Sequence, residues 1–196
     1  MPTIEQELLS FYRSLLTEPQ ADRMEAIQKI TQHIPKLVTS AHNDSLMRTI
    51  TMEEVGQAVM EMPAGKSPGP DGFTTDFFHS CWPIIKQEVW ELVEDTRRTS
   101  GVLSAFNSAF LTLIPKEDGA NNPNKFRPIA LCNVIYKIIT KVIANRLKPL
   151  MPNLTSQEQS RYVEGQKILD GIILAHEVIH SLKSSKKVGM LMKLDM

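Results

Sequence analysis

Apolar residues recur every three or four positions through much of the chain, which is the spacing of amphipathic helices. Thr3 with Gln6 fits a capping box, in which two side chains satisfy the first free backbone groups of a helix. Thr51 with Glu54 fits a second one. We therefore expect helices to begin directly after residues 3 and 51. The second helix should bury one apolar stripe, formed by Val55, Ala58, Val59 and Met62.

Two longer helical patterns follow. The first covers residues 77–99, with Pro83 marking a break or a new first turn and Gly101 as its stop. Its apolar stripe consists of Ile84, Ile85, Val89, Leu92 and Val93. The second runs to Leu147 and is preceded by Asn133, whose side chain can cap it. Its apolar face consists of Ile135, Ile138, Ile139, Val142, Ile143 and Leu147.

A different pattern lies between these two helices. Residues 109–115 and 126–131 read as extended segments, and the polar residues 117–125 between them are rich in Asn and also contain Gly and Pro. An apolar helix is expected over residues 168–182 and a last strand over residues 188–194. The first hundred residues thus read as helices, and extended segments appear only after them, which predicts an α+β fold.

The net charge is zero, but its distribution is uneven. Residues 1–100 carry nine Lys and Arg against fifteen Asp and Glu, whereas residues 101–196 carry thirteen against seven. A basic second half favours binding of phosphate groups, although a solvated charged surface would give the same count.

Several features indicate an intracellular protein. Two cysteines are too few for a disulfide framework. The N-terminus has no basic and apolar signal-peptide pattern, and no apolar run approaches the ~20 residues that a membrane span needs.

Five short motifs occur in a characteristic order, at residues 66–73, 111–116, 126–131, 162–166 and 193–195. In this order they resemble the reverse transcriptases of non-LTR (LINE-type) retrotransposons. The resemblance implies a right-hand polymerase, with residues 1–62 as a helical connector before it. Residues 63–196 would then form the fingers and the first strand of the palm.

The resemblance also implies site residues. Asp195 matches the first of three palm carboxylates that hold two divalent ions, taken as Mg²⁺, during nucleotidyl transfer. Lys116 and Arg127 match the cations that clamp the triphosphate of the incoming deoxynucleotide; an ammonium and a guanidinium suit phosphate oxygens. The hairpin with the other two carboxylates does not occur in these 196 residues, which are therefore expected to be inactive alone.

The same resemblance places an RNA template and a DNA primer on this chain. Gln159, Gly165 and Gln166 belong to a template-side motif, in which Gln166 stands where the family usually carries Arg. Three lysines are further candidates for contacts with the nucleic-acid backbone: Lys66, Lys137 and Lys141. The alternative interpretation is that they are ordinary solvated surface charges.

Two alternatives come from other functional classes. His176, Glu177 and His180 form the His-Glu-x-x-His signature of zinc metalloproteases, but positions 183 and 186 are Lys instead of the Gly and His of its extended form. A non-catalytic helical binding module built from residues 1–100 is the other alternative; it does not account for the extended segments at 109–131. Finally, an unpaired last strand at residues 188–194 predicts self-association through its edge.

Overall fold

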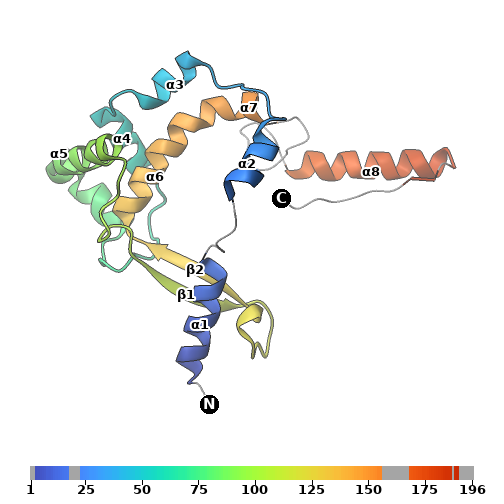
Figure 1. The fold of residues 1–196 in the computed structure, drawn as a ribbon. Coiled ribbons are helices and arrows are strands. Elements are labelled where there is room, and N and C mark those ends of the chain that lie inside the picture. Colours follow the sequence, from blue (N-terminus) through green and yellow to red (C-terminus); the bar gives the residue numbers. More distant parts are fainter. Residues whose placement is uncertain (1–2, 18–22, 156–167, 187, 190–196) are drawn as a thin grey trace. The chain divides into compact units, whose positions relative to one another are not determined.

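The computed structural model describes residues 3–17, 23–155, 168–186 and 188–189 (Figure 1). These residues are mostly helical and include one two-stranded antiparallel sheet, which confirms a mixed helix and strand architecture. Contacts divide the chain into two compact units, each described separately below. The first consists of Met1–Lys36 with Met47–Ile143, and the second of Leu37–Leu46 with Ala144–Met196.

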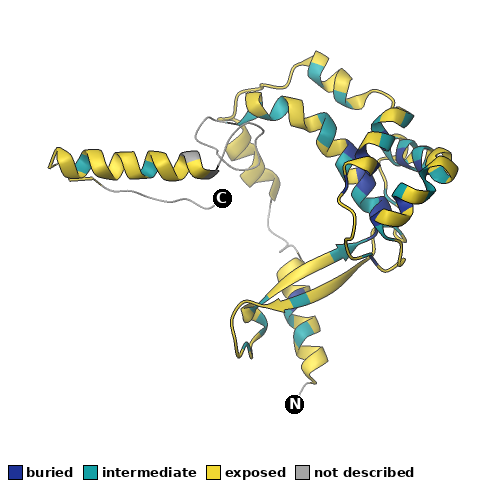
Figure 2. Cartoon of the chain, turned by 180° about the vertical axis from the view of Figure 1, so that it is seen from behind, coloured by how far each residue is buried: buried dark blue, intermediate teal, exposed yellow. Residues whose placement is uncertain are grey.

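The core of the first unit is formed by three helices: α4 (Met52–Met60), α5 (Thr75–Thr99) and α6 (Val134–Leu147). Figure 2 shows the buried residues gathered in these helices. A single hydrophobic cluster contains residues on both sides of position 62, the expected end of the helical connector. Helix α4 therefore shares its core with the segments that follow it.

The start of α4 confirms the capping box. The Thr51 hydroxyl accepts from the Glu54 N–H, and the Glu54 carboxylate accepts from the Thr51 N–H. The expected stripe is buried as well, with Met62 8% exposed and the other three members fully buried: Val55, Ala58 and Val59. The local pattern of α4 was therefore sufficient to predict both its start and its inward face.

Helix α5 departs from the expectation in its interior and at both ends. It runs unbroken through Pro83, although a proline cannot donate the helical hydrogen bond to the carbonyl four residues earlier. Val89 and Val93 are buried as expected, whereas Ile84 is 78% exposed, which makes its assignment to the apolar stripe wrong. The helix begins after Thr74, whose hydroxyl accepts from the Phe77 N–H, and ends at Ser100 in the left-handed conformation, one residue before the expected Gly101.

Polar contacts attach α5 to the segment before α4. The Trp90 indole N–H donates to the Ile50 carbonyl at 2.8 Å, and the Ile50 N–H donates to Glu94 Oε2 at 3.0 Å. Glu94 also accepts from Arg97, and this hydrogen bond raises the pKa of the Arg97 guanidinium. The chain entering α4 is thus fixed by both backbone groups of Ile50.

Helix α6 buries most of its predicted apolar face. Four residues of that face are at most 8% exposed: Ile135, Ile138, Ile139 and Val142. Ile143 and Leu147 are more than a third exposed, so that the stripe is buried only in the first part of the helix. The expected cap is wrong in its partners: the Asn133 carboxamide bonds to Asp71, Ala105 and Ser108, which lie outside the helix.

Outside this core the first unit contains α1 (Ile4–Leu16), α2 (Arg23–Thr31), β1 (Ala109–Pro115), the short 3₁₀ helix η1 (Pro123–Lys125) and β2 (Phe126–Cys132). The capping box of α1, formed by Thr3 and Gln6, is present as predicted. Strands β1 and β2 pair antiparallel from Ala109 with Cys132 to Pro115 with Phe126, which confirms the two extended segments.

The second unit contains helices α7 (Met151–Leu154) and α8 (Ile168–Ser184), the 3₁₀ helix η2 (Lys148–Leu150), most of α3 (Ser40–Met47), and the end of α6 from Ala144 on. Helix α3 was not predicted, because its sequence has no apolar periodicity. Arg146 Nη1 donates to the Leu46 carbonyl at 2.8 Å and so joins two distant segments of this unit. Within the described helices, none combines the length and apolarity that crossing a membrane requires.

Candidate functional site

The β1–β2 hairpin brings Lys116 and Arg127 to one face. Ile114 lies directly opposite Arg127, and pairing continues past the strand end because the Lys116 N–H donates to the Lys125 carbonyl at 2.8 Å. Directly opposite residues of an antiparallel pair, and residues two positions apart on a strand, point to the same side. Lys116, Arg127 and Ile114 therefore share a face.

The cations near this face differ in their contacts. Lys116 Nζ donates to the Asn124 carbonyl at 2.7 Å, and Lys125 Nζ lies 2.7 Å from Glu117 Oε1. Arg127 is exposed, and within the described part of the chain its guanidinium forms neither a salt bridge nor a side-chain hydrogen bond. Arg127 is thus the cation with its full donor set available to an anion, whereas Lys125 is already neutralised by a carboxylate.

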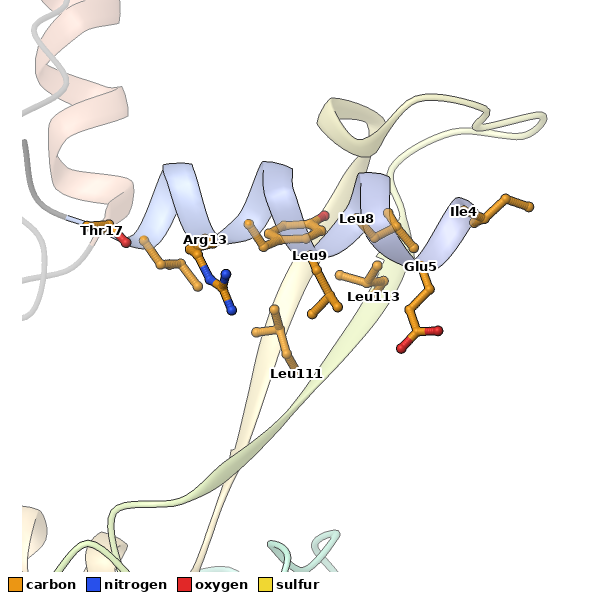
Figure 3. A pocket seen from close by; sticks show the side chains of 10 residues that line it. Ile4, Glu5, Leu8, Leu9, Arg13, Thr17, Leu111 and Leu113 are labelled. Carbon is orange, nitrogen blue, oxygen red and sulfur yellow. The ribbon is translucent and has the colours of Figure 1, made fainter. Parts of the chain in front are cut away.

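The opposite face of the hairpin is covered in part by α1. Leu111 and Leu113 alternate with the residues of the cationic face and point to the other side, towards α1 (Figure 3). An open groove of about 650 Å³ lies between α1 and strand β1. Its apolar lining residues are Ile4, Leu8, Leu9, Leu16, Leu111 and Leu113. Helix α1 therefore supports the hairpin from the side that does not carry Lys116 and Arg127.

Tyr12 is the main polar link between α1 and the hairpin. Its side chain is 6% exposed, and its hydroxyl donates to the Pro123 carbonyl at 3.2 Å. Pro123 begins η1, in the connection between the strands. The two residues are 111 positions apart, so that periodicity could not reveal this contact. Sequence reasoning missed Tyr12 for that reason.

The connection between the strands is a turn that is stabilised by its own hydrogen bonds. Asn122 Oδ1 accepts from the Asn124 N–H at 3.1 Å, and the Lys125 N–H donates to the Asn122 carbonyl at 2.8 Å. Gly119 has φ +71°, a conformation that glycine adopts without strain. These contacts position the Asn124 carbonyl that receives Lys116, and they explain the Asn and Gly content of this segment.

The lysines proposed for backbone contacts lie elsewhere. Lys66 is exposed in the loop before α5, next to Gly65, whose N–H donates to Asp76 Oδ2 at 2.9 Å. Lys137 and Lys141 are half-buried on α6, and Lys141 Nζ lies 2.9 Å from Glu61 Oε2. All three lysines therefore lie on other elements than the β1–β2 hairpin that carries Lys116 and Arg127.

The remaining polymerase candidates lie outside the described residues. They are Gln159, Gly165, Gln166 and Asp195. Of the expected last strand, only residues 188 and 189 are described, so that the expected self-association stays a prediction. Among the described residues there is no group of three or more His, Cys, Asp or Glu side chains that could hold a metal ion.

The zinc signature lies on α8. His176, Glu177 and His180 are all exposed on this helix. The two imidazoles are one turn apart, but a catalytic zinc needs three protein ligands. No third ligand approaches them within the part of the chain that the structure describes.

Comparison with known proteins supports the polymerase interpretation. Residues 114–196 match the family described as "Reverse transcriptase (RNA-dependent DNA polymerase)", and this match includes Lys116 and Arg127. The chain is 29% identical over 171 residues to the "Transposon TX1 uncharacterized 149 kDa protein" of Xenopus laevis, covering 87% of this chain and 13% of that protein.

Further relatives are named as retrotransposon proteins. The chain is 26% identical over 124 residues to a "Retrovirus-related Pol polyprotein from type-1 retrotransposable element R1" of Bradysia coprophila, covering 62% of this chain and 12% of that protein. It is 27% identical over 103 residues to the corresponding R2 polyprotein of Nasonia vitripennis, covering 53% and 10%. These matches favour neither the zinc protease nor the helical binding module. The chain is thus similar to reverse transcriptases over residues 114–196, and over a longer part to proteins named as transposon and retrotransposon products.

Proposed function

We propose that the protein containing these residues is an RNA-directed DNA polymerase that copies an RNA template from a DNA primer. In this proposal residues 63–196 supply the fingers and the first palm strand, and residues 1–62 act as the connector before them. The family match over residues 114–196 supports the polymerase assignment. The chain spans only 13% of the length of the Xenopus laevis relative, and the activity of a whole protein is therefore part of this proposal.

Within that reaction we assign the β1–β2 hairpin to the incoming deoxynucleoside triphosphate. The observation that carries this assignment is the shared face of Lys116 and Arg127, with the Arg127 guanidinium unengaged within the described residues. A guanidinium can bind two phosphate oxygens at once, and an ammonium adds a compact positive charge. Charge developing on the phosphates during transfer would be stabilised by both groups.

The metal and template contacts complete the proposal. Divalent ions are general in this family, and we propose Mg²⁺ with Asp195 as one of its carboxylate ligands. Gln159, Gly165 and Gln166 are proposed to lie beside the template. Lys66 and Lys137 are proposed to contact the nucleic-acid backbone, and Lys141 would first have to separate from Glu61. None of these contacts is needed for the role of Arg127.

Substitution of Arg127 tests the assignment. In a chain completed with the rest of the polymerase domain from an active relative, Arg127→Ala should remove a charge-assisted contact of roughly 1.5–3 kcal/mol. The KM for deoxynucleotides should therefore rise about 10- to 150-fold, since each ~1.4 kcal/mol is tenfold. Primer extension with varied deoxynucleotide concentration measures this change, and a filter-binding assay with primer–template measures nucleic-acid affinity.

The matched control is Lys125→Ala. This residue is also a cation of the hairpin, but Glu117 already neutralises it. Its substitution should leave the KM for deoxynucleotides within about twofold of the unsubstituted enzyme. Equal losses for Lys125→Ala and Arg127→Ala would mean that general surface charge, and not a specific clamp, attracts the nucleotide.

A further inference from the structure

The junction between β2 and α6 holds a polar side chain that the polymerase assignment does not use. Asn133 is 1% exposed, and it and Thr75 are the two buried polar residues of the described part of the chain. A buried carboxamide is costly unless its donors and acceptors are paired. The question is therefore which segments it joins.

Its hydrogen bonds reach two separate segments of the chain. Asn133 Oδ1 accepts from the Asp71 N–H at 3.2 Å, and Nδ2 donates to the Ala105 carbonyl at 3.1 Å and to Ser108 Oγ at 3.3 Å. The partners determine the orientation of the carboxamide, because Asp71 offers a donor and Ala105 an acceptor. An aspartate would lose both donors, and an aliphatic residue would lose all three bonds.

The surroundings of Gly69 show independently that the loop before α5 and the end of β2 are in close contact. A Cβ added at Gly69 would lie 2.3 Å from Asn133 Oδ1, 2.4 Å from the Asn133 backbone nitrogen and 2.6 Å from the Cys132 carbonyl carbon. Two of these atoms belong to the backbone and cannot move aside cheaply. The loop at residues 65–73 therefore passes directly against the end of β2, and the Gly72 N–H closes its turn on the Gly69 carbonyl.

These contacts close the base of the hairpin. Ser108 directly precedes β1 and Asn133 directly follows β2, so that the single carboxamide bridges the two ends of the hairpin and attaches both to the loop before α5. Most residues of both strands are exposed, and burial therefore contributes little to fixing the direction of the hairpin.

We propose that Asn133 is a positioning residue, whose buried carboxamide sets the direction of the hairpin and thereby the place of Lys116 and Arg127. This inference rests on the proposed function for its consequence, though not for its geometry. Arg127 is five residues from Cys132, roughly 17 Å along the strand. A tilt of about 10° at the base would move Arg127 by about 3 Å, and a misplacement of about 1 Å can already cost on the order of a hundredfold in rate.

The geometry is tested on the 196-residue chain by pulsed electron spin resonance. Spin labels on genetically encoded keto amino acids at Asp118, in the hairpin connection, and at Lys86, on α5, report the distance between hairpin and core. Both positions are exposed. Asn133→Ala should broaden this distance distribution by several ångströms, while circular dichroism shows that the helices remain. The matched control is Asn107→Ala, which removes the same carboxamide from an exposed position nearby and should leave the distribution unchanged.

A second, milder variant tests the same contact in case the Asn133→Ala chain does not fold. Ser108→Ala removes one acceptor of the carboxamide at an exposed position and should broaden the distribution to a smaller extent. An unchanged distribution in a folded Asn133→Ala chain would overturn the proposal. So would an unchanged distribution in Ser108→Ala if Asn133→Ala does not fold.

A kinetic cycle separates positioning from general destabilisation. In the completed polymerase, Asn133→Ala should raise the KM for deoxynucleotides on the order of tenfold or more. It should raise the KM by a clearly smaller factor when Arg127 is already Ala, because the part of its effect that is exerted through Arg127 is then absent and only the part through Lys116 remains. Equal effects with and without Arg127 would overturn the positioning role. A broadened distance with no effect of Arg127→Ala itself would instead refute the nucleotide clamp and leave the geometric role of Asn133 supported.

Discussion

The helical core and the β1–β2 hairpin of the first unit are built in opposite ways. Core residues of α4, α5 and α6 are almost inaccessible to solvent, whereas most strand residues of the hairpin are exposed on both faces (Figure 2). The core is therefore stabilised by many close-packed apolar contacts. The hairpin depends on a few specific contacts at its ends, and it carries the candidate chemistry.

This difference separates the residues that determine stability from those that determine geometry. Asn133 fixes the hairpin at its base, and Tyr12 contacts the connection between its strands. An exposed hairpin held at both ends leaves one face open for a ligand, here the face with Lys116 and Arg127. We expect substitutions in the core to change the free energy of unfolding, and substitutions at the two attachment points to change where the hairpin lies.

The largest effect is expected from a cavity in the core. Ile138 is fully buried on α6, and Ile138→Ala should lower the free energy of unfolding by about 2–5 kcal/mol. Urea denaturation followed by circular dichroism measures the loss. Ile84→Ala is the matched control, because Ile84 is 78% exposed and its truncation should cost no more than about 0.5 kcal/mol. Comparable losses in the two variants would break the distinction between core and surface drawn from burial.

A smaller effect is expected where α1 meets the hairpin. Tyr12→Phe keeps the ring and removes the hydrogen bond to the Pro123 carbonyl, which should cost about 0.5–1.5 kcal/mol. Because this bond attaches α1 to the hairpin connection, hydrogen exchange should become faster at the Lys125 amide and in α1, and stay unchanged in α4.

Tyr136→Phe is the control for this variant, since it removes the same hydroxyl from a half-buried tyrosine on α6. We expect it to leave the exchange of Lys125 and α1 as it is. Faster exchange in α4 of the Tyr12→Phe chain would show that α1 supports the core, and that the attachment is not local to the hairpin.

The same difference explains how far the sequence could be interpreted. The capping boxes before α1 and α4, and the buried face of α4, are local patterns that the structure confirms. Ile84 was misassigned because helical spacing alone does not determine how wide the buried face is. Asn133 was assigned to a helix cap because that role is local, whereas its observed partners Asp71 and Ala105 are 62 and 28 positions away.

For the candidate site, the family resemblance singled out Lys116 and Arg127, and the strand register adds that the two residues share a face. Their roles stay a proposal. The contacts that attach the hairpin, through Tyr12 and Asn133, join positions that no periodicity relates. Of these contacts, only the close approach at Gly69 is indicated in the sequence, by a glycine in a loop rich in Gly and Pro. The sequence does not indicate which residues Gly69 approaches.

The smallest effect is expected from the ion pair at the edge of the core. Glu61 follows α4 and Lys141 lies on α6, and both side chains are more than a third exposed. A double-mutant cycle with Glu61→Gln and Lys141→Met should give a coupling of about 0.2–1 kcal/mol, which high salt reduces. A coupling as large as the effect of Ile138→Ala would mean that polar contacts, and not apolar burial, hold the core together.

The same pair also tests the proposed nucleic-acid contact of Lys141. If Lys141 binds the nucleic-acid backbone in the completed polymerase, Glu61→Gln should release the Lys141 ammonium from its ion pair. Binding of primer–template should then become severalfold stronger at low salt, since one more phosphate is neutralised. This gain should disappear in the Lys141→Met background, because the charge that responds is then absent. Stronger binding in both backgrounds would instead reflect the loss of a negative charge at Glu61, and the lysine would belong to the core alone.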